Sequence, residues 1–403
     1  MNLFESIKGD RTIWIVVVIL SLFSLLVVYS SSIALAYRYK DGHTEYFLFK
    51  HALLTLLGLF LIYYIHKIKI TTKELNIIGL VGFPISIILL IFTLMMGVKS
   101  GEASRWLEVP GLGITFQSSD VAKITLIIFI ARGLAFYKNK LNEFKDVIYK
   151  IGLPTAIICF LILISNFSTA FLLAITIFYM LFISNVPFKI LLKLIGILIL
   201  LAIIFVSTIY FFPNILPRGK TWKSRIENYF NKENKSNYQV EQAKIAISNG
   251  VLIGKGPGNS AQRSFLPQAS SDFIYAIIIE EYGTLVGIFI LMSFLVIFFR
   301  TIRIVQKSKS LFYSYVVAGL SFNMILQAIV NMAVAVNLLP VTGQPLPFIS
   351  MGGTSLIFSS INIGIILNIS RQIYEQEKTL INKEKTQNKN IIDIHQTEAK
   401  IQA

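Results

Sequence analysis

Residues 188–212 read FKILLKLIGILILLAIIFVSTIYFF, an apolar run longer than a buried core helix requires. A helix of roughly 20 such residues crosses the ~30 Å hydrocarbon core of a bilayer. Comparable runs recur from Trp14 to Ile369, and the chain of 403 residues is 55% hydrophobic and only 14% charged. Soluble domains carry about 25% charged residues. The sequence therefore predicts an all-α, polytopic membrane protein, and it excludes soluble folds.

Ten segments are predicted as transmembrane helices, with nine or eleven as the alternative counts, because boundaries drawn from a pattern shift by several residues. They are residues 13–36, 45–65, 75–97, 121–137, 147–165, 168–184, 188–212, 273–299, 311–338 and 354–370. An even number of spans places both chain ends on the same side of the membrane.

Lysine and arginine in the short loops choose that side, because cytoplasmic loops are enriched in these residues. The cations on the N-terminal side are Lys8, Arg11, Lys67, Lys69, Lys73, Lys138, Lys140, Lys145, Lys189, Arg300, Arg303, Lys307 and Lys309. Both termini are therefore predicted to be cytoplasmic. The net charge of +16 is attributed to the membrane surface, with no nucleic-acid partner. We expect a transmembrane domain at residues 1–370, with outer loops at 98–120, 213–272 and 339–353, and a polar tail at 371–403 that is partly helical or disordered.

Cysteine and histidine offer no recognisable site. The single cysteine, Cys159, lies in an apolar run, and the four histidines show no ligand spacing. Disulfide frameworks and zinc sites are therefore excluded. The candidates for chemistry are polar groups near or within the membrane, where they are costly to place.

The first candidate region is the outer loop that leads into the span at 121–137. It contains Arg105, Gln117 and Asp120, with Lys123 one turn inside the span. In a structural interpretation, Asp120 complements the helix dipole, and Lys123 either pairs with Asp120 or extends toward water. In the alternative, Arg105 and Lys123 face an outer cavity that holds an anion such as pyrophosphate.

The second region is the long outer loop, where Tyr238 and Gln239 precede a helical stretch and the glycine-rich residues 250–260. Glycine lets a backbone approach phosphate closely, but neither Walker spacing nor a preceding strand supports a phosphate loop. Many cations in this loop, Arg225 among them, would suit polyanionic lipid headgroups. Ordinary loop solubility is the alternative.

The third region places Asp272 where the long loop enters the span at 273–299, with Glu280 and Glu281 two to three turns deeper. Asp272 could cap the helix, or it could act as a general base or hold a divalent cation, since partial desolvation raises the basicity of a carboxylate. For Glu280 and Glu281, a buried structural pairing and catalysis stay open.

The fourth region is the most specific string in the chain, PVTGQPLPFISMGGTS at residues 340–355. Its prolines and glycines predict a non-helical segment beside the membrane, which is tolerable only if it is buried or lines a cavity. Gln327 and Asn331 precede it on one helix face, where their amides can hydrogen-bond across helices.

With these motifs in this order, the sequence resembles the shape, elongation, division and sporulation family of bacterial membrane proteins, whose members are FtsW, RodA and SpoVE. The matching residues are Ser104 to Trp106, Gln117, Ser119, Lys123, Tyr238, Gln239, Gly254, Gly256, Gly258 to Ser260, Leu266, Pro267, Asp272 to Ile274, Glu280, Glu281, Gly283, Thr342, Gly343, Pro345 to Phe348, Gly352 and Gly353. Departures from the family pattern are Ser118, Asp120, Asn166, Gln268, Ser270 and Ser271. Residues 256–260 and 341–344 look more like the division member than the elongation member.

The resemblance implies a peptidoglycan glycosyltransferase that polymerises lipid II at the outer face of the bacterial cytoplasmic membrane, at the division septum. It implies that the enzyme acts with a class B penicillin-binding transpeptidase, other divisome membrane proteins, undecaprenyl-pyrophosphate-linked glycan and membrane lipid. The alternatives are a lipid II flippase, a non-catalytic scaffold and an elongation-type polymerase.

Roles for individual residues follow from the resemblance together with the chemistry above. Asp272 is the predicted catalytic residue, and whether it also holds Mg²⁺ or Mn²⁺ is left open. The predicted substrate or pyrophosphate ligands are Arg105, Lys123, Arg225, Gln239 and Ser260. The predicted supporting residues are Gln117, Glu280, Glu281, Asn331, Thr342, Pro347 and Ser350.

Overall fold

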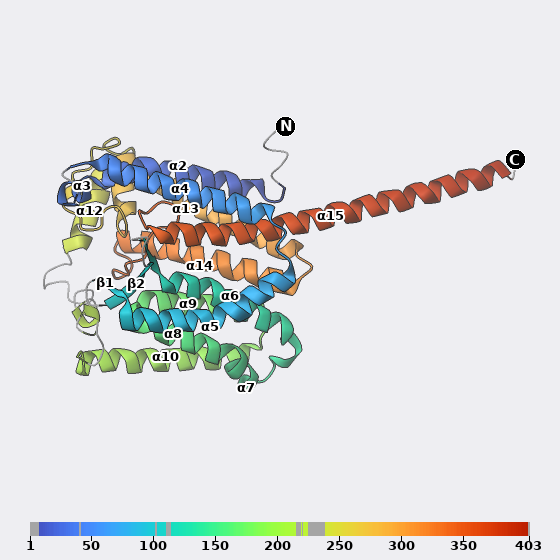
Figure 1. Cartoon of the computed structure of the whole chain (residues 1–403), viewed down its shortest axis with the longest axis horizontal. Helices are drawn as coiled ribbons and strands as arrows, with labels where there is room; N and C mark the ends of the chain where they lie inside the picture. The colour runs from blue at the N-terminus through green and yellow to red at the C-terminus, as the bar shows by residue number, and fades with distance from the viewer. Residues whose placement is uncertain are drawn as a thin grey trace.

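The computed structural model describes residues 8–39, 42–100, 103–109, 114–214, 219, 221–224 and 238–401, and helices dominate them (Figure 1). In chain order the elements are α2 (Arg11–Ser31), α3 (Ile33–Tyr39), α4 (Thr44–Lys67), α5 (Thr72–Met96), β1 (Val98–Ser100), β2 (Ala103–Val109), β3 (Ile114–Gln117), α6 (Ser118–Phe136), η1 (Lys138–Lys140), α7 (Phe144–Val147), η2 (Ile148–Gly152), α8 (Leu153–Ser165), α9 (Phe167–Ile183), α10 (Phe188–Phe211), α12 (Tyr238–Gly250), η3 (Gln262–Ser264), α13 (Ile274–Lys307), α14 (Leu311–Ala335) and α15 (Thr354–Ile401).

Eight helical segments of the described chain are long and apolar enough to cross a membrane. They are α2, α4, α5, the continuous stretch Phe144–Ser165, α10, α13, α14 and α15 as far as Asn382. These segments confirm the predicted all-α membrane class. The two other predicted spans correspond to α6, which carries three charged residues, and α9, which has only 17 residues, so the count of ten stays a prediction.

Side chains at the first turns explain where several of these helices begin. Asp10 caps α2 by accepting a hydrogen bond of 3.1 Å from the Ile13 backbone N–H. Thr71 and Glu74 form a capping box at the start of α5. Asn166 caps α9, so this departure from the family's aspartate keeps a side-chain oxygen that can accept the same kind of bond.

The helices form a bundle with two distinct ends (Figure 1). We call one the loop end, which carries the strands, α12 and residues 251–273. The other is the cationic end, where α4, α6 and α13 finish, where α2, α5 and α14 begin, and where α15 leaves the body. The loop end corresponds to the predicted outer side, and the cationic end to the predicted cytoplasmic side.

The segment between α5 and α6, predicted as the first outer loop, contains a three-stranded antiparallel sheet of order β1-β2-β3. Trp106 pairs with Gln117 and Leu107 with Phe116. Because α6 begins directly after Gln117, this pairing places β2 beside the start of α6. The sheet is an addition to the predicted loop. β1 and β3 have only three and four residues, too few to show an alternating pattern that would identify the partners of β2.

The centre of the bundle is α14, whose polar side chains are buried along with its apolar ones. These polar groups pair with neighbouring helices: Asn323 donates to the Thr176 hydroxyl over 3.0 Å. On α5 and α6, Ser86 and Thr125 make a similar contact of 2.6 Å. Such interhelical bonds remove the cost of leaving a polar group unpaired in an apolar interior.

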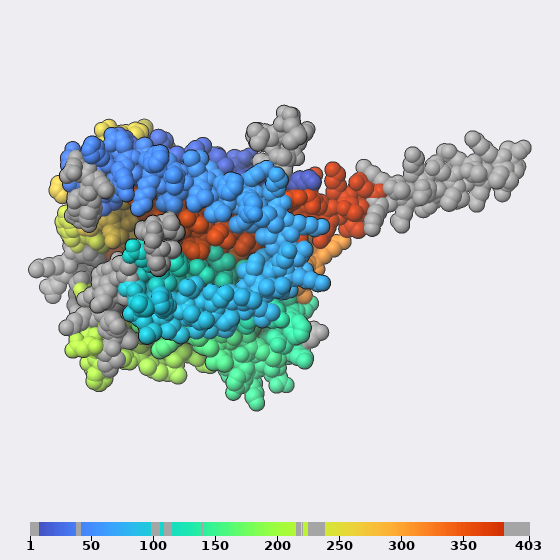
Figure 2. Space-filling view, viewed as in Figure 1, coloured from blue at the N-terminus to red at the C-terminus, as the bar shows by residue number. Residues whose placement is uncertain are grey.

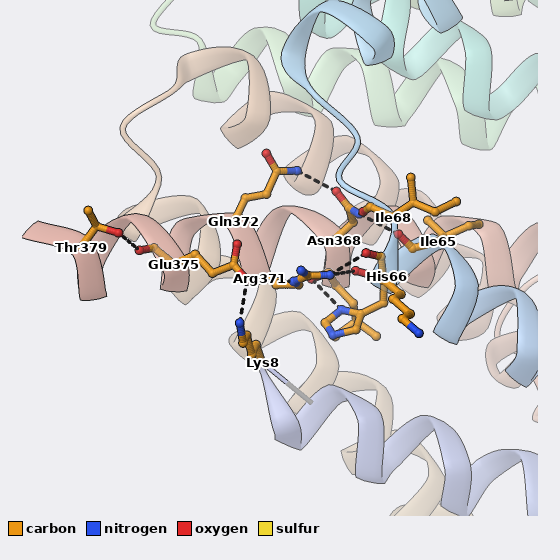
Figure 3. Close-up of polar contacts among 11 residues, drawn as sticks. Lys8, Ile65, His66, Ile68, Asn368, Arg371, Gln372, Glu375 and Thr379 are labelled. Carbon is orange, nitrogen blue, oxygen red and sulfur yellow. Dashed lines mark hydrogen bonds and ion pairs between the residues drawn. The ribbon is translucent and has the colours of Figure 1, made fainter. Parts of the chain in front are cut away.

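At the cationic end, α15 is fixed to the rest of the bundle by its own polar residues (Figure 3). Asn368 donates to the backbone carbonyls of Ile65 and Ile68. These carbonyls lie at the end of α4, where the helix itself supplies no N–H partner. Arg371 donates to the Lys67 carbonyl over 2.7 Å, and Glu375 pairs with Lys8 over 3.2 Å. These contacts hold the last turn of α4 against α15 and connect the start of the chain to it.

Beyond these contacts, α15 continues as a single helix to Ile401 (Figure 1). Figure 2 shows its red surface between the blue surface of α4 and the cyan surface of α5 before it leaves the body. Of the two forms predicted for the tail, the described residues therefore show the helical one. The division into a membrane domain at 1–370 and a tail at 371–403 stays a prediction.

Candidate active site

Asp272 lies at the loop end, in a turn immediately before α13, with a half-buried side chain. The residue at the helix cap position is Phe273. The capping role and the catalytic role of Asp272 both stay predictions. The turn joins the loop that ends at Asp272 to the long apolar helix α13, so the carboxylate lies at the end of a candidate membrane span.

The motif segment at 340–353 packs against this turn. Asn331 on α14 donates one amide hydrogen bond to the Asp272 carbonyl at 2.9 Å and another to the Gln344 carbonyl at 2.7 Å. Gly343 lies close to the Asp272 carboxylate: a Cβ built on Gly343 would be 3.5 Å from Asp272 Oδ2. Gly343 has φ +68°, a conformation that favours glycine. The motif backbone is thus one wall beside the Asp272 carboxylate.

Ser350 makes a second connection between the same two segments. Its hydroxyl donates to the Ser271 carbonyl at 2.6 Å and accepts from the Leu346 N–H at 2.7 Å. The Met351 N–H adds a backbone bond of 2.8 Å to the Ser270 carbonyl. Ser350 is 3% exposed, so both bonds are protected from water. Pro347 is buried in the turn that places Ser350, and Thr342 is half-buried next to Gly343.

A second polar chain extends from the motif segment to α6. Gln327 donates to the Pro345 carbonyl at 2.8 Å and accepts from Lys123 Nζ at 3.4 Å. Lys123 in turn pairs with Asp120 at 2.8 Å. The structural interpretation of Asp120 and Lys123 is therefore confirmed as far as their pairing is concerned. The pyrophosphate role of Lys123 stays a prediction, and Asp120 already compensates part of the Lys123 charge.

The other predicted substrate ligands lie at different places around the loop end. Arg105 on β2 donates to the Ser165 carbonyl at 3.2 Å, which joins the sheet to the end of α8. Gln117 donates to Ser119 at 2.8 Å at the junction of β3 and α6. Gln239 is half-buried in the first turn of α12. Arg225 lies outside the described residues.

The glycine-rich segment has a structural role that the sequence did not indicate: it completes a broken helix. At Gly283, α13 leaves helical geometry, with φ 85° and ψ 168°. The break frees the N–H groups of Thr284 and Leu285 and the carbonyls of Glu280 and Glu281. The loop supplies partners for all of them: Val251 and Leu252 carbonyls accept, and Lys255 and Gly256 N–H groups donate, over 2.9–3.4 Å.

This exchange explains why an interrupted helix is tolerated in the membrane, where unpaired backbone groups are costly. It also uses two of the N–H groups that a phosphate-binding loop would need to offer. The interpretation of residues 250–260 as a phosphate cradle therefore has no support at Lys255 and Gly256.

Glu280 and Glu281 are both fully buried and bind the same loop. Glu280 accepts from the Ser260 hydroxyl and from the Gln262 N–H, and Lys255 Nζ lies 3.4 Å from it. The Ser260 hydroxyl also accepts from the Arg263 N–H at 3.1 Å. The geometry thus favours structural pairing for Glu280. It also gives Ser260 a structural role, while the predicted contact of Ser260 with substrate stays a prediction.

Glu281 joins three segments that are distant in the sequence. It accepts from the Ser30 hydroxyl at the end of α2 and lies 3.9 Å from Arg263, which itself donates to Ser30 at 3.1 Å. Sequence reasoning missed Ser30, because only the tertiary structure brings it to α13, and it took Arg263 only as one of the loop cations. Gln344 was noted as part of the motif, but its hydrogen bond to Thr169 on α9, at 2.8 Å, was not predicted.

A protein-only metal centre finds no support in the described part of the chain, where no three His, Cys, Asp or Glu side chains group together. Mg²⁺, however, is often held by one or two carboxylates together with substrate phosphates. Asp272 alone fits that second arrangement, in which the substrate would supply the remaining ligands.

Fold and site together define an integral membrane protein with an aspartate held at one end of its helical bundle by a proline- and glycine-rich segment. A family model described as "Cell cycle protein", covering FtsW, RodA and SpoVE, matches residues 10–375, and the chain belongs to this family.

Individual relatives agree with this assignment. The chain is similar to proteins named "Probable peptidoglycan glycosyltransferase FtsW" in several bacteria. The one from Coxiella burnetii is 33% identical over 93% of this chain and 99% of the relative. Those of Alcanivorax borkumensis and Bacillus subtilis are each 31% identical, over 89% and 92% of this chain respectively and 92% of each relative.

Two solved structures share the fold. One, from a study of the coordination of polymerization and crosslinking by a peptidoglycan synthase complex, has a TM-score of 0.70 at 20% identity and covers 91% of this chain and 98% of that one. The other, rod shape determining protein RodA of Thermus thermophilus, has a TM-score of 0.63 at 19% identity with the same coverage.

Proposed function

We propose that this protein is a peptidoglycan glycosyltransferase that polymerises lipid II into glycan strands at the outer face of the cytoplasmic membrane. The observation that carries the proposal is Asp272, held at the loop end by Asn331 and Ser350, in a chain whose relatives bear that enzyme name. The loop end would then face outward and both termini the cytoplasm, in agreement with the cations at the opposite end.

In the proposed reaction, Asp272 takes the proton from the C4 hydroxyl of the acceptor sugar. The hydroxyl oxygen forms a bond to the anomeric carbon of the donor chain, and the bond from that carbon to undecaprenyl pyrophosphate breaks. The departing pyrophosphate carries the negative charge, which nearby cations stabilise best where water is scarce. Arg105 suits this role better than Lys123, because in the described residues Arg105 has no carboxylate partner, whereas Lys123 pairs with Asp120.

A class B penicillin-binding transpeptidase is the proposed partner, with the division septum as the site of action. The name FtsW among the relatives supports the division role, and the similar chain from a peptidoglycan synthase complex supports joint polymerisation and crosslinking. Other divisome membrane proteins and membrane lipid complete the proposed surroundings.

The test is polymerisation of lipid II by the purified protein together with its cognate transpeptidase, whose own active site is blocked. Glycan chains are expected as the product. If the complex forms and no chains appear, a parallel assay of lipid II movement between the leaflets of vesicles decides whether the protein is a flippase. Neither product nor movement would leave the scaffold role.

Removing the Ser350 hydroxyl is expected to slow polymerisation by about 10-fold. A hydrogen bond contributes ~1 kcal/mol net, and its loss here also leaves the buried Leu346 N–H without a partner. Ser350→Ala should lower the turnover number and leave the KM for lipid II nearly unchanged, because Ser350 positions Asp272 through the backbone. Ser248→Ala is the matched control: that hydroxyl is exposed and bonds only within α12. Equal rates for both variants would contradict the positioning role.

A divalent cation is proposed as an optional partner of Asp272 and the substrate pyrophosphate. Treatment with EDTA is then expected to reduce polymerisation strongly, and added Mg²⁺ or Mn²⁺ to restore it, while the melting temperature of the protein stays constant because no described carboxylate cluster depends on the ion. Full activity in EDTA would remove the metal from the proposal.

A further inference from the structure

A cavity of about 310 Å³, open to the surface of the bundle, lies at the cationic end, away from the candidate active site. It is bounded by α5, α6 and α14, and its lining residues are Asn76, Arg132, Ala135, Phe136 and Phe312. None of these residues takes part in the contacts around Asp272. The cavity therefore needs an explanation of its own.

Helix packing places the two polar lining residues, Asn76 and Arg132, opposite each other on adjacent helices. Gly79 of α5 packs on Ile128 of α6, and Gly82 packs on Thr125, so the two helices run antiparallel. Continuing one turn from Gly79 toward the cationic end places Asn76 opposite Arg132. Each lies about one turn inside its helix end, the depth at which lipid headgroups meet acyl chains.

Both side chains have hydrogen-bonding capacity that the described protein does not use. Asn76 Oδ1 is buried and has no hydrogen-bond partner among the described residues. Arg132 is half-buried, and within the described residues its guanidinium lies over the Phe136 ring, 6.0 Å from the guanidinium carbon to the ring centroid. Carboxylates nearby are engaged elsewhere: Glu74 bonds to Thr71 and Asp146 to Lys150.

We propose that this cavity binds the headgroup of an anionic phospholipid that carries a hydroxyl, as phosphatidylglycerol does. The Arg132 guanidinium would donate to the phosphodiester, a planar anion-binding geometry that lysine does not reproduce. Asn76 Oδ1 would accept from a headgroup hydroxyl, which satisfies a buried acceptor. Ala135, Phe136 and Phe312 would contact the glycerol backbone and the first methylenes of the acyl chains.

The position of the cavity favours lipid over a soluble anion. Phe136, the last residue of α6, is 72% exposed, so this aromatic ring is available for contact with lipid. Anionic lipids are attracted to cationic surfaces of this kind, and basic pockets between transmembrane helices bind such headgroups. A soluble phosphate would lack the apolar contacts with Phe136 and Phe312.

The test measures binding of fluorescent phosphatidylglycerol to the full-length protein in nanodiscs of phosphatidylcholine. Arg132→Gln is expected to weaken binding by about 10-fold, the equivalent of ~1.4 kcal/mol. Lys140→Gln is the matched control, because it removes the same charge from an exposed position at the same end of the bundle. Arg132→Lys should restore little of the affinity. Thermal melting of each variant verifies that the fold is intact.

A second comparison tests the hydroxyl. The wild type should bind phosphatidylglycerol more tightly than phosphatidic acid, and Asn76→Leu should remove this preference. Equal weakening by Arg132→Gln and Lys140→Gln would overturn the proposal in favour of diffuse attraction to the surface. Displacement of the lipid by millimolar glycerol phosphate would overturn it in favour of a soluble anion.

Discussion

Asp272→Asn is expected to reduce lipid II polymerisation by about 100-fold to 10,000-fold, the usual contribution of a general base. Asparagine has nearly the same shape as aspartate, so the backbone bond from Asn331 and the packing against Gly343 should persist. What disappears is the ability to accept a proton from the acceptor sugar. The measurement is the rate of glycan-chain formation by the complex with the blocked transpeptidase.

Asp146→Asn serves as the control for this experiment. Asp146 lies half-buried at the cationic end and pairs with Lys150 at 2.8 Å; both side chains keep contact with solvent, and ion pairs of this kind contribute little. Its rate should equal that of the wild type. An Asp272→Asn protein that is folded, bound to its partner and as active as the wild type would refute the assignment of Asp272 as the base.

Gly283→Ala is expected to have the largest effect on stability. A Cβ at this position would lie 2.2 Å from the Leu252 carbonyl oxygen and 2.5 Å from Ile253 C, both backbone atoms that cannot move aside cheaply. The backbone conformation there, φ 85° and ψ 168°, is also nearly restricted to glycine. Together these terms predict a loss of at least about 3 kcal/mol. Thermal melting of the detergent-solubilised protein measures it.

Gly196→Ala is the matched control, since nothing lies within 4 Å of a Cβ built at that position on α10. Alanine favours a helix by about 0.5–1 kcal/mol over glycine, so this variant should be as stable as the wild type or slightly more so. Wild-type melting of Gly283→Ala would mean that the loop and the helix break do not depend on each other as the structure indicates.

The break in α13 connects stability to the site. Glu280 and Glu281 hold the glycine-rich loop on the loop-end half of this helix, and the same half begins directly after Asp272. A helix that could shift at Gly283 would move the aspartate with it. Pairing of the broken backbone with residues 251–256 therefore keeps the Asp272 turn in place.

The sequence alone determined the class of the protein, because residues such as 188–212 have no stable environment other than a bilayer. It also located Asp272 and the segment at 340–353, since a carboxylate at a span boundary and a proline-rich break are costly features that need a purpose. Asn331 and Gln327 were predicted to share a helix face, and both do contact that segment.

Only the tertiary structure decided which polar groups meet. Ser30 and Glu281 are 251 residues apart, and Ser350 and Ser271 are 79 apart, so no local pattern records these contacts. The glycines at 250–258 were ambiguous for the same reason: glycine permits close approach of any backbone, and the sequence cannot state whether a phosphate or a broken helix occupies the space. Hydrophobic periodicity and the free-energy cost of a polar group in the membrane are local properties that the sequence carries. Contacts between distant side chains form only once the helices have packed.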